Sequence, residues 1–196
     1  FQNMLADFPA ETLHETIMHF HDTPARYQAL HAAIEADVKG RRRAVEPEIA
    51  FALAREKESA VMMRLYAAGE LPLRVTHNDT KLNNVILDAA DRTALCVIDL
   101  DTVMPGLVAN DFGDSIRFGA NTALEDEKDL SRVSLSLPLY EAYTRGFLAV
   151  CGARLTPLEI ETLPMGAKLM TMENGIRFLT DYLQGDIYYA VARPDH

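Results

Sequence analysis

Apolar side chains recur every three or four residues over much of the chain, which is the spacing of one face of a helix. A first helix is predicted over residues 24–39, because Thr23 and Pro24 supply start signals and Gly40 a stop signal. A longer helical pattern follows over about 47–68. Together with a short helical stretch before them, these segments predict a helical bundle.

The hydrophobic period changes after about residue 70. Short extended runs occupy 73–76 and 84–87, and 94–100 reads as a stronger strand, joined to the run before it by a polar turn at 88–92. Helical periodicity returns after about residue 110, with long amphipathic stretches at 126–150 and 157–184. This order predicts a single α+β unit that is mostly helical, with small β-hairpins in the middle.

Composition narrows the class of protein. Apolar residues make up 48% and charged residues 24%, as in globular proteins. A net charge of −10 disfavours nucleic acid as the partner, because phosphate backbones need a basic surface. No apolar run approaches the roughly 20 residues that span a bilayer, so no membrane partner is expected. The two cysteines do not make a disulfide framework, which favours a location in the reducing cytoplasm. Cys96 is expected to pack as a small hydrophobic side chain.

The residues that can carry chemistry concentrate between positions 75 and 101. Residues 77–84 read H-N-D-T-K-L-N-N, and Asp99 ends an apolar run 20 residues after Asp79. In phosphoryl transfer, a carboxylate orients or accepts the proton of the attacking hydroxyl, while an Asn and a second Asp hold Mg²⁺ on the nucleotide phosphates. The spacing therefore predicts Asp79 as the base and Asn84 and Asp99 as magnesium ligands.

At these motifs the chain resembles the aminoglycoside phosphotransferase and choline kinase family, whose fold is like that of protein kinases. The resemblance implies ATP as the phosphoryl donor, Mg²⁺ as the cofactor, and a small-molecule hydroxyl as the acceptor. It gives Asp79, Asn84 and Asp99 the same roles as the spacing does. It also implies that His77 supports the backbone of the loop and that Asp111 buttresses the same loop.

Some assignments in this region stay open at the level of sequence. His77 could instead serve as a catalytic acid, and Asp101 as a second metal contact or as a loop hydrogen-bond acceptor. Residues 111–113 spell D-F-G, the metal-binding tripeptide of protein kinases, but the shorter spacing and the strand context favour Asp99 as the ligand. Lys81 stands where aminoglycoside enzymes often carry His, which argues against an aminoglycoside substrate.

A closer resemblance is to the bacterial N-acetylhexosamine 1-kinase branch, and it implies phosphorylation of an amino sugar at its anomeric hydroxyl. On this basis Arg177, Asp181 and Glu173 form a sugar-binding face, and His21 lies near the same pocket. The alternative for these three helix positions is an exposed, salt-bridged stripe. The segments that carry the resemblance are 20–24, 76–84, 98–106, 111–117 and 173–183.

The sequence shows no Gly-rich phosphate loop and no strand Lys paired with a helix Glu, which kinases need. Residues 1–196 therefore read as a C-terminal lobe, and we expect an ATP-binding lobe to precede Phe1. The expected partners are a small sugar and a nucleotide. Choline, aminoglycosides and homoserine remain alternative substrates, and a non-catalytic, pseudokinase-like binding module is the alternative from another class.

Overall fold

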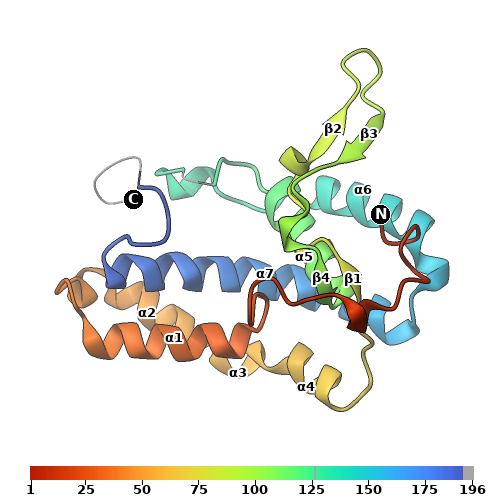
Figure 1. The fold of residues 1–196 in the computed structure, drawn as a ribbon. Coiled ribbons are helices and arrows are strands. Elements are labelled where there is room, and N and C mark those ends of the chain that lie inside the picture. Colours follow the sequence, from red (N-terminus) through yellow and green to blue (C-terminus); the bar gives the residue numbers. More distant parts are fainter. Residues whose placement is uncertain (126, 192–196) are drawn as a thin grey trace.

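The computed structural model describes residues 1–125 and 127–191. Its central element is the long helix α7 (Pro157–Gln184), against which α1 (Thr23–Ala36) and α5 (Val108–Gly119) pack. Figure 1 shows α1 and α7 lying side by side, with the β2–β3 hairpin projecting away from the helices. Within the described part of the chain, no helix is long and apolar enough to cross a membrane.

Helix α7 has the extent that the sequence predicts. Its first turn is closed by a capping box, in which the Thr156 hydroxyl accepts from the Glu159 N–H and the Glu159 carboxylate accepts from the Thr156 N–H. Gly185, at φ 102°, ends the helix in the left-handed conformation. The Glu159 carboxylate also accepts from Arg74 Nε at 2.5 Å, which ties the start of α7 to the first strand.

Helices α5 and α7 approach each other at two glycines. A Cβ added at Gly166 would overlap the carbonyl of Ala109, and one added at Gly113 would overlap the backbone of Gly166. The close approach holds α5 in place while the buried Asp111 carboxylate on it faces the backbone of His77 and Asn78. It therefore fixes the floor on which the candidate site is built.

Helix α1 differs from its predicted limits. The side chain of Asp22 caps it by accepting from the Ala25 N–H at 3.1 Å, and Asp37 ends it early in the left-handed conformation. Val38, inside the predicted range 24–39, therefore lies beyond the helix and is 62% exposed.

The single helix predicted over 47–68 is wrong. The chain instead forms α2 (Glu46–Leu53), α3 (Glu56–Ser59) and α4 (Val61–Ala67). The reason is that its apolar positions serve two cores: Ile49 packs with α1 and the end of α7, whereas Met62 packs with α5. One straight helix could not direct both sets of side chains to these places.

The strands form two antiparallel pairs. β1 (Arg74–Thr76) pairs with β4 (Met104–Gly106), and β2 (Val85–Leu87) pairs with β3 (Ala94–Val97). The hairpin of β2 and β3 is as predicted, although β3 stops short of residue 100. Strand β4 was not predicted, because Pro and Gly are poor strand formers. Cys96 is exposed on the hairpin, so the expectation that it packs inside is wrong.

Helix α6 (Leu137–Cys151) begins later than position 126, where the sequence pattern placed its start; residue 126 itself lies outside the described residues. Ser136 caps the helix by accepting from the Leu139 N–H.

The predicted α+β architecture, mostly helical with small hairpins, is confirmed. Short 3₁₀ turns link the elements at Ala10–Thr12, Arg42–Val45, Leu82–Asn84, Leu100–Thr102, Leu130–Arg132 and Gly152–Arg154.

Candidate active site

The segment 77–84, which we call the catalytic loop, joins β1 to β2. Because β1 pairs with β4 and β4 leads directly into α5, the start of the loop lies against the N-terminal part of α5. Strand pairing thus brings together two motifs, at 77–84 and 111–117, that are separated along the sequence.

Asp111 on α5 fixes the backbone of the loop. Its buried carboxylate accepts from the N–H groups of His77 at 3.0 Å and Asn78 at 2.8 Å, and from the Gln2 side chain at 2.5 Å. Burial raises the pKa of Asp111, although these N–H donors oppose the shift. The carboxylate of the D-F-G tripeptide is therefore directed at the loop, as a buttress, and not outward to a metal.

His77 is buried, and backbone groups engage both of its ring nitrogens. Nε2 lies 3.0 Å from the Ile98 carbonyl, to which it can donate, and Nδ1 accepts from the Asp79 N–H at 3.3 Å. This pair of partners requires the neutral ring with its proton on Nε2. His77 consequently links the loop to the segment just before Asp99, and neither nitrogen is left for proton transfer.

Asn78 occupies the left-handed region, with φ 66°. Glycine and asparagine are the residues that most readily adopt this conformation, so Asn78 suits its position in the loop. The Asn78 side chain donates to the Thr102 carbonyl at 3.0 Å, and the Thr102 hydroxyl donates to the His77 carbonyl at 2.7 Å. Thr102 therefore holds the loop through two hydrogen bonds, one to a loop side chain and one to a loop backbone carbonyl.

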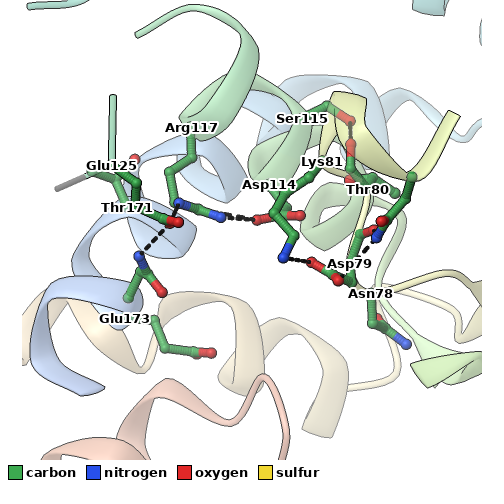
Figure 2. Close-up of polar contacts among 12 residues, drawn as sticks. Asn78, Asp79, Thr80, Lys81, Asp114, Ser115, Arg117, Glu125, Thr171 and Glu173 are labelled. Carbon is green, nitrogen blue, oxygen red and sulfur yellow. Dashed lines mark hydrogen bonds and ion pairs between the residues drawn. The ribbon is translucent and has the colours of Figure 1, made fainter. Parts of the chain in front are cut away.

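Asp79, the predicted base, is half-buried and its two carboxylate oxygens face different partners. Oδ2 accepts from Asn84 Nδ2 at 3.0 Å, and Oδ1 lies 3.2 Å from Lys81 Nζ. Asn84 Nδ2 also donates to the Asp79 carbonyl at 2.8 Å. Figure 2 shows the contact between Asp79 and Lys81. Within the loop, Asn84 therefore sets the orientation of the Asp79 carboxylate.

The predicted metal ligands lie on adjoining backbone. The Ile98 N–H donates to the Asn84 carbonyl at 2.9 Å. Asp99 is the next residue after Ile98, so this bond holds Asp99 near Asn84. Asp99 is exposed and lies two residues past the end of β3, in the left-handed region at φ 63°. Such a conformation is costly for a residue with a Cβ, and strain of this kind concentrates at functional sites.

The donor set of these residues fits magnesium. The side-chain nitrogen of Asn84 donates its hydrogen bonds to Asp79. Among the described residues, no group donates a hydrogen bond to the Asn84 side-chain oxygen or to the Asp99 carboxylate, so these oxygens are available as metal ligands. Hard oxygen donors of this kind suit Mg²⁺. Asp101 is exposed one turn further on, and its backbone carbonyl accepts from the Thr16 hydroxyl. No cluster of three His, Cys, Asp or Glu side chains that could hold a metal occurs in residues 1–125 and 127–191.

The predicted sugar-binding face of α7 is not an exposed stripe. Glu173 is buried and accepts from the Thr23 hydroxyl at 2.8 Å, and its other oxygen lies 2.9 Å from His21 Nδ1. The guanidinium of Arg177 lies 5.3 Å from the centroid of the Phe20 ring. The alternative of a solvated, salt-bridged face is therefore wrong.

Asp181, one turn beyond Arg177, is buried and forms hydrogen bonds with the backbone of the segment that follows α7. Its carboxylate accepts three backbone N–H groups between 2.8 and 3.0 Å. These bonds give it a structural task, since they turn the chain back against the helix end and place an aromatic ring near Arg177. The three donors are Ile187, Tyr188 and Tyr189.

Sequence reasoning did not single out Asp114 and Arg117 on α5. Asp114 Oδ1 accepts from Arg117 Nε at 3.0 Å and Nη2 at 2.9 Å, and Arg117 Nη1 donates to Glu125 at 2.5 Å. Figure 2 shows this chain of contacts beside Lys81 and Asp79. The i,i+3 spacing of Asp114 and Arg117, on the helix that also carries Asp111, was the available signal.

Two cavities flank the site, and neither is lined by Asp79. The larger, about 1280 Å³, runs along α7 and is lined by Arg117, Phe178 and Tyr182 among others. The smaller, about 670 Å³, lies behind the catalytic loop and is lined by Asn84 and Tyr143, where burial raises the pKa of Tyr143 to about 12. The candidate active site is therefore defined by the contacts of its motifs and not by the size of a cavity.

A protein-family model, that of the phosphotransferase enzyme family (APH), matches residues 8–145. The match contains the catalytic loop, the Asp99 segment and Asp111, and it covers more than half of the chain. An ATP-dependent phosphotransferase is what membership indicates. The chain belongs to the phosphotransferase enzyme family.

Proposed function

We propose that the protein is a cytoplasmic small-molecule kinase that transfers phosphate from ATP to the anomeric hydroxyl of an N-acetylhexosamine. The observation that carries the kinase chemistry is the arrangement around Asp79, whose carboxylate is oriented by Asn84 on a loop fixed by Asp111. The sugar is a finer assignment, and it rests on the resemblance of the 20–24 and 173–183 segments to that branch.

In this proposal Asp79 orients the acceptor hydroxyl and accepts its proton as the phosphoryl group transfers. Lys81, 3.2 Å from the same carboxylate, supplies positive charge close to the point of transfer. Asn84 and Asp99 would hold Mg²⁺, which neutralises charge on the nucleotide phosphates when bound. The protein contributes mainly orientation, because the loop backbone is hydrogen-bonded on several sides before any ligand arrives.

The acceptor would lie between the catalytic loop and α7. Arg177 is half-buried among aromatic rings, and such a group can donate to sugar oxygens while a ring packs against the sugar. Asp181 and Glu173 support this face from behind through the bonds described above. The ATP-binding lobe would be contributed by sequence preceding Phe1.

The experiment is a measurement of ADP release by the longer protein, including the proposed ATP lobe, with Mg-ATP. The acceptors are N-acetylglucosamine, N-acetylgalactosamine, galactose, choline, homoserine and kanamycin. The proposal predicts turnover confined to the two N-acetylhexosamines. Turnover with choline, homoserine or kanamycin alone would overturn the sugar and keep the reaction. Folded protein that binds ATP but turns over no acceptor would favour a binding module.

A further inference from the structure

His21 joins three parts of the molecule that are far apart in the sequence. It lies just before α1, and only 7% of its side chain is exposed. Ring atom Nδ1 is 2.9 Å from Glu173 Oε1 on α7, and Nε2 is 2.9 Å from the carbonyl oxygen of Asn78 in the catalytic loop. Because both ring nitrogens have protein partners, neither is left for a substrate.

The Asn78 carbonyl is an acceptor, and so is the Glu173 carboxylate in its ionised form, so a ring that donates to both carries a proton on each nitrogen. A carbonyl has no proton to give, and a neutral ring would point a lone pair at either the carbonyl or the carboxylate. Burial alone lowers the pKa of His21, but the hydrogen bond and charge of Glu173, the Asn78 carbonyl and the charge of Asp114 outweigh burial, and the pKa is raised. Glu173 on α7 and Asp114 on α5 are the charged groups that face the ring.

The Asn78 residue is consequently held from both sides. Asp111 accepts from its N–H at 2.8 Å, and His21 donates to its carbonyl, which belongs to the peptide bond leading into Asp79. A left-handed residue with a Cβ tends to relax when such contacts are removed. The carbonyl contact therefore bears on the direction in which the Asp79 side chain leaves the loop.

We propose that the His21 imidazolium, paired with Glu173, is a positioning residue that fixes the catalytic loop and thereby orients Asp79 for phosphoryl transfer. The proposal rests on the proposed function, in which Asp79 is the base. It also gives the site a pH dependence of its own. The fixed loop is complete while His21 is protonated and is lost as pH rises through its raised pKa.

The first test compares His21→Gln with the wild type in the longer, ATP-binding protein. Gln can donate to the Asn78 carbonyl but cannot supply a charged partner for Glu173. We expect kcat to fall about ten- to a hundredfold, the scale of a small misplacement of a catalytic group. The KM for ATP should change less than about twofold, because the His21 ring bonds to Glu173 and the Asn78 carbonyl and to neither of the proposed magnesium ligands. His31→Gln, at an exposed histidine paired with Glu56, is the matched control and should keep full activity.

The second test is the pH profile of kcat. Removing the negative charge in Glu173→Gln lowers the pKa of His21, so the alkaline decline of kcat should begin at lower pH than in the wild type. A purely structural loss would reduce kcat equally at every pH. An unshifted alkaline limb in Glu173→Gln, or a His21→Gln variant with wild-type kcat, would overturn the positioning role.

A third measurement separates this inference from the proposed function. The ¹⁵N chemical shifts of the His21 ring in residues 1–196 should show both nitrogens protonated at pH 7. A neutral ring at pH 7 would overturn the inference whatever the enzyme does. Full activity of Asp79→Asn would instead overturn the proposed base, and the ring shifts would still report whether the His21 pairing exists.

Discussion

At the scale of single residues, the site depends on how a few polar groups divide their hydrogen bonds. Asn78 donates its N–H to Asp111 and its side-chain amide N–H to the Thr102 carbonyl, and its own carbonyl accepts from His21. Asp111 in turn accepts the N–H groups of two successive loop residues. Buried groups of this kind are costly when one partner is removed, because the remaining group stays desolvated.

Replacing Asp111 with Asn tests this division. An Asn side chain offers one acceptor oxygen where two are used, so one of the two loop N–H groups loses its partner. We expect Asp111→Asn to lower the free energy of unfolding by about 1–3 kcal/mol. Urea unfolding measures the change, with Asp7→Asn at a 98% exposed side chain as the control. Equal stability of the two variants would show that Asp111 does not hold the loop.

The sequence predicts some of these residues and misses others for a clear reason. Asp79 and Asn84 stand out because their spacing within one short loop matches the chemistry of phosphoryl transfer. Glu173 was singled out by the resemblance of the 173–183 segment, but its hydrogen bonds were not predicted, since Thr23 and His21 lie about 150 residues away. Spacing can reveal a local motif, whereas a contact between distant segments depends on the packing of whole helices.

At the scale of elements, helices and strands set by local signals were predicted, and those that depend on contacts between distant segments were not. The limits of α7 follow from the cap at Thr156 and the glycine at 185, both of which are local signals. The break of the 47–68 segment depends on two cores that form only in the folded chain. Strand β4 exists because β1 is there to pair with it, and its own residues favour no strand.

The contact of α5 with α7 gives a prediction at this scale. In Gly166→Ala the new methyl group would overlap the Ala109 carbonyl, so the helices must separate and the free energy of unfolding should fall by about 1–3 kcal/mol. Gly175→Ala, in the same helix with open space around it, should raise stability by up to about 1 kcal/mol. Thermal or urea unfolding measures both changes. If Gly166→Ala raised the free energy of unfolding, as Gly175→Ala should, the close approach of the two helices would be contradicted.

At the scale of the whole molecule, the β2–β3 hairpin and its surroundings expose large apolar side chains. Contiguous apolar surface usually marks a place where another part of a protein packs. The candidate metal ligands lie at the base of this region, where a nucleotide would have to be held. We therefore propose that the ATP-binding lobe covers it. The exposed side chains are Leu82, Ile86, Leu87, Leu95, Ile98 and Leu100.

The isolated chain gives the corresponding prediction. Residues 1–196 alone should show little or no Mg²⁺-dependent ATP turnover, because the groups that cradle the phosphates would be contributed by the other lobe. ADP release by this chain, measured beside the longer protein at the same concentration, checks the prediction. Turnover by residues 1–196 at the rate of the longer protein would contradict the two-lobe account.

The central claim, that Asp79 serves as the base of a phosphoryl transfer, is tested most directly by ADP release from the longer protein carrying Asp79→Asn. The substitution keeps the size of the side chain and removes the carboxylate, so turnover should fall about a hundredfold or more while the fold is retained. Asp91→Asn, in the exposed turn of the hairpin, is the matched control and should leave turnover unchanged. Full turnover by folded Asp79→Asn would contradict the account.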